Sequence, residues 1–276
     1  MKFTKMQGCG NDYVYVDCFS ETVNERPEMA RRVSNRNYGI GSDGLICICP
    51  SDMADFKMDM YNADGSSSEM CGNGIRCLGK YVYDRGLTDK TVITVETGGG
   101  IRTLWLNLGD EEVESVRVCM GKADFKCENV PIRCCAREFV AMPFDADGIT
   151  YTVTALSVGN PHAVVFVEDP EALDLTDIGP RFEKHSSFPE SVNTEFAKVL
   201  DRNTIQMRVW ERGSGETLAC GTGATATFAA AHRLGLVDSK AKLILRGGEL
   251  EIELDNTTGE LYMTGPAQFV FDGELL

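Results

Sequence analysis

Hydrophobic and polar positions alternate along the chain with two periods, which predicts interleaved strands and helices. Helical spacing of apolar residues predicts helices at 27–37, 73–85 and 222–234, and the last two end at Gly86 and Gly235. Alternation or short apolar runs predict strands at 12–17, 44–49, 55–61, 91–97, 102–108, 113–120, 138–142, 151–156, 163–167, 196–200, 204–210, 243–245, 249–254 and 268–271. This order of elements predicts an α/β (α+β) chain.

A faint internal repeat divides this pattern into two halves. Spacings of 60 and 15 residues separate the members of two triplets: Asn11, Cys71 and Gly86, and Asn160, Cys220 and Gly235. At the offset of 149 residues, six glycine pairs also coincide, among them Gly98 with Gly247 and Gly99 with Gly248. A typical domain has about 150 residues, so the length of 276 residues is compatible with either one domain or two. We therefore expect two pseudo-symmetric domains, residues 1–118 plus 267–276 and residues 119–266.

Charge and composition exclude several classes of function. The net charge is −15, from 42 acidic and 27 basic residues, and no cluster of Lys and Arg offers a surface for nucleic acid. No run of 18 apolar residues predicts a membrane span, and periodic residues begin too early for a signal or transit peptide. Eleven cysteines, an odd number without an export signal, indicate reduced thiols. We therefore expect a cytoplasmic protein that contacts neither nucleic acid nor membrane.

Two matched cysteine motifs offer the most specific chemistry. Cys71-Gly72-Asn73-Gly74 and Cys220-Gly221-Thr222-Gly223 each follow a polar loop and open a predicted helix. The glycines permit positive φ and close approach of a ligand, and the first-turn N–H groups form an anion site. A cysteine at such an end has its thiolate stabilised by the helix dipole.

The duplication of this motif carries the functional interpretation. One such cysteine alone is more often a buried structural residue beside a tight turn. Two copies at matched positions of a repeat predict two thiols opposed across one cleft. Two opposed acid/base groups suit racemisation or epimerisation, in which a carbon acid loses a proton on one face and gains one on the other.

Further polar residues occur at matched positions. Nine residues before each cysteine lies a polar turn, Asn62-Ala63-Asp64-Gly65 in the first half and Glu211-Arg212-Gly213-Ser214 in the second. Asn160-Pro161-His162 matches Asn11-Asp12-Tyr13, and His162 is the only histidine within the repeat pattern. Ordinary structural roles remain open for each of them, since Asn-rich turns are common and an arginine often forms a surface ion pair.

In combination and in order, from about residue 3 to residue 271, these motifs resemble those of the diaminopimelate epimerases. Besides the segments above, the resemblance rests on Gly8-Cys9-Gly10, Ile75-Arg76-Cys77, Val192-Asn193 and Glu216-Thr217. It implies that each domain is a curved, mostly antiparallel sheet wrapped around a central helix. Proline racemases share the two-cysteine plan, but the blocks around Cys71 and Glu211 resemble the epimerases.

The resemblance implies a specific reaction and specific roles. Family members interconvert LL- and meso-diaminopimelate, without pyridoxal phosphate or metal, for lysine and peptidoglycan precursors. Cys71 and Cys220 would be the thiolate/thiol pair, tuned by His162 and Glu211. The residues implied to hold this small-molecule substrate are Asn11, Asn62, Gly72, Asn73, Asn160, Asn193, Glu211, Arg212, Gly221 and Thr222. A homodimer and the absence of cofactors are also implied.

Departures and alternatives remain. Gly44 stands where some members carry a substrate-contacting glutamine, and Cys9 lies two residues from Asn11, where a non-thiol is usual. A proline or hydroxyproline racemase would use the same thiols, a redox protein would use them as a disulfide switch, and a ligand-binding protein would tolerate losing either. The cysteines of residues 119–135 lack zinc-site spacing, so no metal is expected there.

Overall fold

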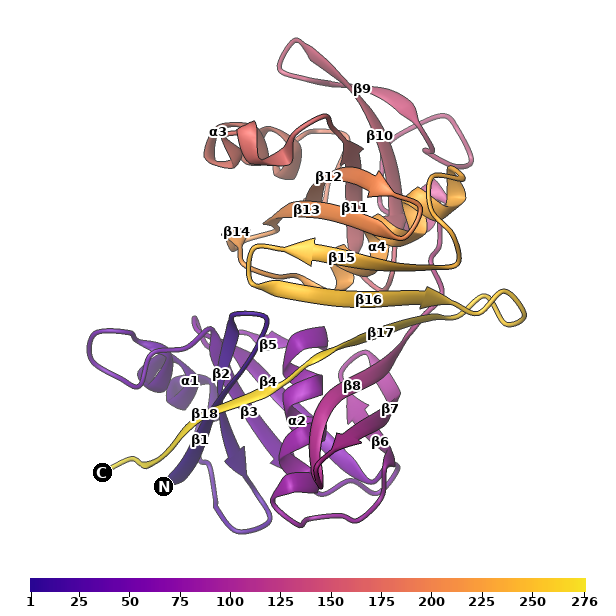
Figure 1. The fold of residues 1–276 in the computed structure, drawn as a ribbon. Coiled ribbons are helices and arrows are strands. Elements are labelled where there is room, and N and C mark those ends of the chain that lie inside the picture. The colour runs from indigo at the N-terminus through magenta and orange to yellow at the C-terminus, as the bar shows by residue number, and fades with distance from the viewer. The chain divides into compact units, whose positions relative to one another are not determined.

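The computed structural model describes residues 1–276, which form two compact units. Unit 1 comprises Met1–Cys119 and Thr264–Leu276, and unit 2 comprises Met120–Met263. Both chain termini lie in unit 1, where the last strand returns to pair with the first (Figure 1). None of the helices combines the length and the apolar composition that crossing a membrane requires.

Unit 1 is a mostly antiparallel sheet with two helices. Its elements are β1 (Lys2–Gly8), β2 (Asn11–Asp17), α1 (Arg26–Ser34), β3 (Gly44–Cys49), β4 (Phe56–Asn62), β5 (Ser67–Ser68), α2 (Gly72–Asp84), β6 (Val92–Thr97), β7 (Gly100–Gly109), β8 (Glu112–Gly121) and β18 (Gln268–Glu274). The strand order is β18–β1–β2–β3–β4–β6–β7–β8, and β5 forms a short hairpin with β4. Only the pairs β2/β3 and β4/β6 are parallel.

Unit 2 repeats this topology. Its elements are η1 (Cys127–Asn129), β9 (Met142–Ala146), β10 (Ile149–Ser157), β11 (Pro161–Phe166), η2 (Pro170–Ala172), α3 (Leu175–Glu183), β12 (Asn193–Asp201), β13 (Thr204–Glu211), β14 (Gly215–Thr217), α4 (Gly221–Arg233), β15 (Lys240–Leu245), β16 (Gly248–Leu254) and β17 (Leu261–Pro266). The order β9–β10–β11–β12–β13–β15–β16 is antiparallel except at β11/β12 and β13/β15. The parallel pairs therefore fall at the same places in both units, and the predicted fold class is confirmed.

The central helices are buried because strands pack around them. In unit 1, α2 contacts β1, β2, β7 and β18, and in unit 2, α4 contacts β10, β11, β12, β13, β15 and β16 (Figure 1). Small apolar residues suit such a position, and α4 is accordingly rich in alanine. α2 instead buries two charged side chains, which find partners. The ammonium group of Lys80 lies 2.6 Å from Asp84, and the Arg76 guanidinium donates to the carbonyls of Gly72 and Pro266 at 3.1 and 3.2 Å.

Several predicted boundaries are wrong, each for a local reason. Helix α1 ends at Ser34 rather than 37 because Asn35 takes an extended conformation. Helix α3 was not predicted, since Pro180 lies inside it and a proline normally interrupts a helix. The strand predicted at 138–142 lies at Met142–Ala146.

The repeat also slips by one residue at its last hairpin. Gly100 begins β7 three residues after β6 ends, and Gly248 begins β16 three residues after β15 ends. Matching these hairpins pairs Gly99 with Gly247 and Gly100 with Gly248, an offset of 148 residues rather than 149. The glycine pairs at 98/247 and 99/248 are therefore not structurally equivalent.

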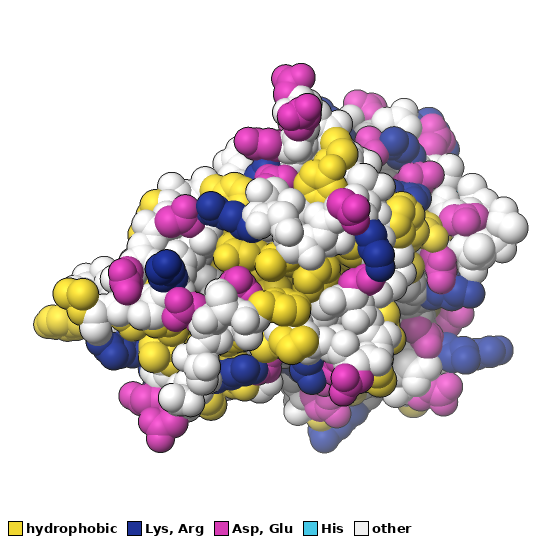
Figure 2. Space-filling model, turned by 90° about the horizontal axis from the view of Figure 1, so that it is seen from below, with side chains coloured by type: hydrophobic (Ala, Val, Ile, Leu, Met, Phe, Trp, Pro, Cys, Tyr) yellow, Lys and Arg dark blue, Asp and Glu magenta, His cyan; other side chains and the backbone are white.

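The excess of acidic residues is not gathered into one patch on the face drawn in Figure 2. There, basic and acidic side chains are interspersed, with hydrophobic side chains between them. Such a mixture supports solubility more readily than the binding of a polyelectrolyte.

Candidate active site

Each predicted catalytic cysteine caps a central helix. Cys71 is the N-cap of α2 and Cys220 the N-cap of α4, with nearly identical backbone angles of φ −122°, ψ 120° and φ −123°, ψ 114°. Each Sγ accepts a hydrogen bond from the backbone N–H three residues later, at Gly74 and Gly223, with both distances 3.3 Å. The predicted placement of both motifs at helix N-termini is confirmed, and each sulfur takes the place of the usual capping oxygen.

Close packing, rather than positive φ, explains the glycine at the fourth position of each motif. Neither Gly74 nor Gly223 has a positive φ. A Cβ at Gly74 would lie 2.7 Å from the Ile46 side chain, and one at Gly223 would lie 2.7 Å from Glu195 Oε1. The glycines therefore let a side chain of β3 or β12 reach the first turn of the helix.

Hydrogen bonds orient the surroundings of Cys71. The Cys71 thiol donates to Asn11 Oδ1 at 3.2 Å, and Asn11 Nδ2 donates to Asp43 at 2.7 Å. Asp43 thereby fixes the orientation of the amide, which presents its oxygen to the thiol. Burial, followed by the charges of Cys71 and Asp43, raises the pKa of the nearby Tyr13 well above its ordinary value, so its hydroxyl is neutral.

A longer hydrogen-bonded chain leads to Cys220. His162 Nδ1 lies 2.7 Å from Glu195 Oε1, and His162 Nε2 lies 2.9 Å from Asn160 Oδ1. Asn160 Nδ2 donates to the Thr222 hydroxyl at 3.3 Å, and that hydroxyl lies 3.4 Å from the Cys220 sulfur. In this orientation Asn160 Oδ1 can only accept, so His162 Nε2 carries a hydrogen and donates it.

Unit 2 favours the protonated form of Cys220. Burial, followed by the negative charges of Glu211 and Glu195, raises the pKa of Cys220 well above its ordinary value. The hydrogen bonds from Thr222 and the Gly223 N–H act in the opposite direction but are outweighed. The predicted stabilisation of a thiolate by the helix N-terminus is thus present at Cys220 but does not decide its ionisation.

Burial also shifts the carboxyl group at the start of this chain. Glu195 and His162 are both fully buried. Burial raises the pKa of Glu195, and the contact with His162 only partly offsets it. Its second oxygen, Oε2, has no hydrogen-bond partner. Burial therefore favours the protonated form of the Glu195 carboxyl group.

The remaining predicted residues of unit 2 form a second hydrogen-bonded group. Asn193 donates to the Pro161 carbonyl at 2.9 Å and accepts from the backbone N–H of Arg212 at 3.0 Å. The exposed Arg212 guanidinium donates to the Glu190 carbonyl at 3.0 Å. Glu211 accepts from Thr217 at 2.5 Å. Asn193 therefore positions the backbone of Arg212, and Thr217 positions Glu211.

Two predicted residues of unit 1 have their own local settings. Asn62 ends β4 and donates to Ser66 at 3.0 Å, so it serves as a turn residue as well as a candidate ligand. Asn73 is buried in the first turn of α2.

Cys9, expected near the site, lies 3.7 Å from the Arg76 guanidinium, and burial raises its pKa. The first residues of the two helices, Gly72 and Gly221, carry no side chain, so only their backbone groups can contact a ligand.

The main residue missed by sequence reasoning is Glu195. It lies in β12, whose sequence NTEFAKVLD contains other polar residues, so the sequence does not mark Glu195 as special; only the structure shows that it is fully buried. Asp43 and Tyr13 were also missed. Their roles depend on the parallel pairing of β2 and β3, which places Tyr13 beside Gly44.

Gly44 itself has a packing explanation. A Cβ at this position would lie 2.2 Å from the Tyr61 carbonyl oxygen and 2.8 Å from the Tyr13 ring. The Tyr61 carbonyl belongs to the backbone of β4, which cannot move aside as easily as the end of a flexible side chain. The glutamine found here in some members would therefore require a shift of the strand in this chain.

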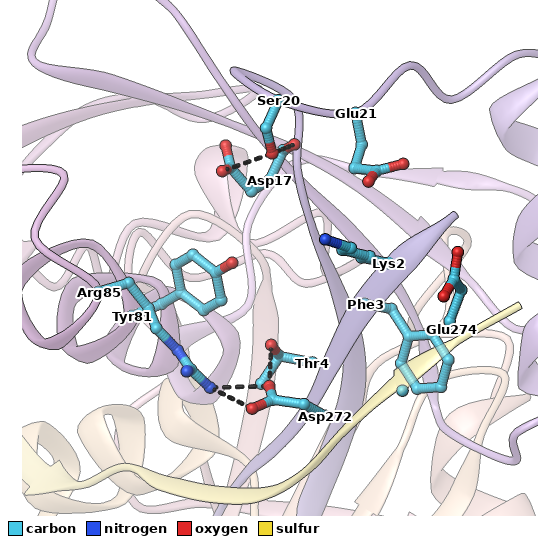
Figure 3. A pocket seen from close by; sticks show the side chains of 11 residues that line it. Lys2, Phe3, Thr4, Asp17, Ser20, Glu21, Tyr81, Arg85, Asp272 and Glu274 are labelled. Carbon is cyan, nitrogen blue, oxygen red and sulfur yellow. Dashed lines mark hydrogen bonds and ion pairs between the residues drawn. The ribbon is translucent and has the colours of Figure 1, made fainter.

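Other regions offer little for the predicted chemistry. No group of three or more His, Cys, Asp or Glu side chains converges as a metal site. A pocket of about 460 Å³ lies in unit 1, between β1, β18 and the end of α2. Figure 3 shows the side chains that line it. Two of its acidic side chains already have partners, since Asp272 binds Arg85 and Asp17 accepts from Ser20. No predicted site residue lines this pocket.

Comparison with solved structures supports the fold. A probable proline racemase from Agrobacterium radiobacter K84 aligns with a TM-score of 0.70 and 15% identity, covering 100% of this chain and 92% of that one. A phenazine biosynthesis protein of the PhzF family from Bacillus anthracis aligns with a TM-score of 0.70 and 17% identity, covering 100% and 99%. At this level of identity the likeness concerns the fold alone.

Comparison with sequences identifies the family. The family profile described as "Diaminopimelate epimerase" matches residues 3–126 and 154–270. The diaminopimelate epimerase of Acetivibrio thermocellus is 52% identical over 275 residues, covering 100% of this chain and 98% of the relative. That of Methanococcus maripaludis strain C6 is 50% identical over 275 residues, covering 100% and 99%. The chain belongs to the diaminopimelate epimerase family.

Proposed function

We propose that this chain interconverts LL- and meso-diaminopimelate by two-base proton transfer at Cα, with Cys71 and Cys220 as the thiolate/thiol pair. The observation that carries the proposal is the duplicated cap, in which each unit holds one cysteine at a helix N-terminus with the same backbone geometry. The names of the relatives supply the substrate, and the two caps supply a chemistry that suits it.

The helix N-termini would stabilise the charge that develops in this reaction. Removing the α-proton spreads negative charge into the α-carboxylate. The first-turn N–H groups at Gly72-Asn73 and Gly221-Thr222 are suited to hold that carboxylate, because they lack intrahelical partners. Preorganised donors of this kind commonly supply a large part of the rate enhancement. The reaction then needs neither a metal nor an organic cofactor.

The two thiols would act in turn as acid and base. Because burial and nearby carboxylates raise the pKa of Cys220, we assign it as the acid in the resting enzyme. Cys71 would first give up the proton that it donates to Asn11 Oδ1 and would then remove the α-proton in the first direction, and the roles would exchange in the reverse reaction. The chain from Glu195 through His162 and Asn160 ends at Thr222, beside Cys220, and is placed to adjust that thiol.

The remaining polar residues would hold the distal amino-acid end. Asn62, Asn193, Glu211 and Arg212 offer amide, carboxylate and guanidinium groups for one ammonium and one carboxylate. Asn11 and Asn160 lie beside the thiols and would contact the reacting end. A proline racemase needs no distal site, which makes Arg212 and Glu211 the residues that separate the two reactions.

We further propose that residues 1–118 plus 267–276 and residues 119–266 are the two functional halves, each supplying one thiol. The family resemblance supports a homodimer, and the exposed apolar side chains of Val270 and Phe271 on β18 offer a surface for it. A cytoplasmic location and supply of both lysine and peptidoglycan precursors are likewise proposed from the family.

The test is incubation with LL-diaminopimelate in D₂O, with proline in a parallel reaction. We expect deuterium at Cα and appearance of the meso isomer, with no exchange into proline. Activity on proline alone would overturn the proposed substrate. Full turnover after chelation and carbonyl-reagent treatment would support a reaction independent of metal and pyridoxal phosphate.

A further inference from the structure

Two cysteines that the proposed reaction does not use lie side by side in unit 2. The Cys134 thiol donates to the Cys127 sulfur with an Sγ–Sγ distance of 2.8 Å, and it lies 3.3 Å from the Ala136 carbonyl. A disulfide bond is about 2.05 Å long, so a small movement of either side chain would bring the sulfurs to bonding distance.

The backbone holds both cysteines in place. Cys127 begins η1 and is buried in the core of unit 2, which also contains Val130 and Phe139, and Cys134 packs against the same core. The Cys127 N–H donates to the Arg137 carbonyl at 2.9 Å, which ties the two ends of the segment together. Closure of the bond would therefore need side-chain rotation rather than refolding.

The two thiols differ in access. Cys134 is partly exposed and its neighbour Cys135 is exposed, whereas Cys127 is only 7% exposed. Burial and the neighbouring Cys134 raise the pKa of Cys127 to about 12. An oxidant arriving from solvent would therefore meet Cys134 first, and Cys127 would react second.

We propose that Cys127 and Cys134 form a redox-active dithiol that closes to a disulfide with low-molecular-weight disulfides as oxidant. The Cys134 thiol first loses its proton to water, and the thiolate then attacks the small disulfide, forming a mixed disulfide and releasing one small thiolate. Cys127 passes its proton to that thiolate and attacks the Cys134 sulfur, releasing the second small thiolate, which takes a proton from water. Two protein thiols are oxidised and one small disulfide is reduced to two thiols.

This site is separate from the thiols of the proposed reaction. The hydrogen-bonded chain that reaches Cys220 contains neither Cys127 nor Cys134. Closing the bond should leave epimerisation unchanged. It should raise the midpoint of thermal unfolding, because a closed loop restricts the unfolded chain.

The sequence makes the bond simple to detect. Trypsin cleaves after Lys126, Arg133 and Arg137, so the two cysteines fall in separate peptides, 127–133 and 134–137. The intact protein is treated with oxidised glutathione, alkylated, unfolded and digested. We expect the two peptides to appear joined, with a mass lower by two hydrogen atoms than their sum, and to separate after reduction.

Matched variants identify the partner cysteine. Cys134→Ser should abolish the joined peptides and the shift in unfolding midpoint, whereas Cys135→Ser should retain both. Alkylation of Cys127 and Cys134 in the glutathione-treated wild type would overturn the proposal. So would joined peptides that persist in Cys134→Ser and vanish in Cys135→Ser. Epimerase activity measured beside each digest distinguishes this bond from oxidation of Cys71 or Cys220.

Discussion

Three matched positions around the first turn of each central helix carry different chemistry: Tyr13, Ile46 and Arg76 in unit 1, and His162, Glu195 and Thr225 in unit 2. Both units keep the same cap and the same close approach at the fourth residue. Arg76 and Thr225 even bind the same carbonyl, that of the first helical residue, at 3.1 and 2.8 Å.

The comparison separates what the backbone requires from what the chemistry requires. The cap geometry, the glycines and the strand order are common to both units, so they form the architecture that positions each cysteine. The charged side chains near the two caps, in contrast, differ between the units. A guanidinium lies under the first turn of α2, whereas carboxylates of Glu195 and Glu211 lie near Cys220 and raise its pKa. The side chains around the two caps therefore differ in charge, although the backbone that holds the caps is repeated.

The largest expected effect is loss of either thiol. Cys71→Ala and Cys220→Ala should each reduce epimerisation by ~10³-fold or more, because one proton transfer loses its catalyst. Exchange of the α-proton in D₂O measures the loss, and the exposed Cys135→Ala serves as a control that should keep full activity. Retention of wild-type turnover by either active-site variant would disprove the two-base mechanism.

The second-largest expected effect is on stability and tests Arg76, the cation under the first turn of α2. Arg76→Met should lower the free energy of unfolding by about 2 kcal/mol, because the Pro266 carbonyl loses a buried donor. Urea unfolding with a linear extrapolation gives the value. Arg76→Lys keeps the charge but not the forked geometry and should recover only part of it. An unchanged midpoint in Arg76→Met would mean that the guanidinium is dispensable.

A smaller expected effect tests the Glu195 carboxylate of unit 2. Glu195→Gln removes a negative charge near Cys220, so the pKa of that thiol should fall and its alkylation should begin at lower pH. We expect kcat to fall by ~10-fold, because His162 loses the partner that orients it.

The matched control for this variant is Ile46→Val, which alters the equivalent position of unit 1 without a change of charge. It should leave the pH dependence of Cys220 alkylation unchanged. If Glu195→Gln also left that profile and kcat unchanged, the hydrogen-bonded chain would have no part in tuning Cys220.

The smallest expected effect tests Thr225, the neutral residue of unit 2 that matches Arg76. Thr225→Val keeps the size of the side chain but loses the hydrogen bond to the Gly221 carbonyl, at a cost of about 1 kcal/mol in unfolding free energy. Thr225→Ser retains the hydroxyl and should lose less. A larger loss for Thr225→Val than for Arg76→Met would reverse the comparison between the units.

Much of this architecture follows from local signals. The helices that open at Gly72 and Gly221 and close before Gly86 and Gly235 follow from helical spacing and glycine stops, and the cap cysteines follow from the repeat. The fold class is confirmed. The missed helix α3 contains Pro180, a residue whose local preference is overruled by packing.

The contacts of the site follow from pairing that no local pattern specifies. His162 meets Glu195 because β11 and β12 run parallel with His162 beside Asn193, which directs the two side chains toward one another. Likewise, Cys127 and Cys134 are seven residues apart in an irregular segment, where periodicity makes no prediction. Local sequence patterns indicate which segments are helices or strands. They do not determine the register between strands or the course of irregular backbone segments.

The return of β18 to β1 orders the events of synthesis. Unit 2 is a continuous stretch of chain, Met120–Met263, so all of its strands have been made before the last residues emerge. Unit 1 must wait, because Lys2–Gly8 gains its outer neighbour only from residues 268–274. On the ribosome the second half can therefore finish folding while the first half still exposes an unpaired strand edge. An edge of this kind invites aggregation, so a chain that stops before residue 268 should be poorly soluble rather than merely inactive.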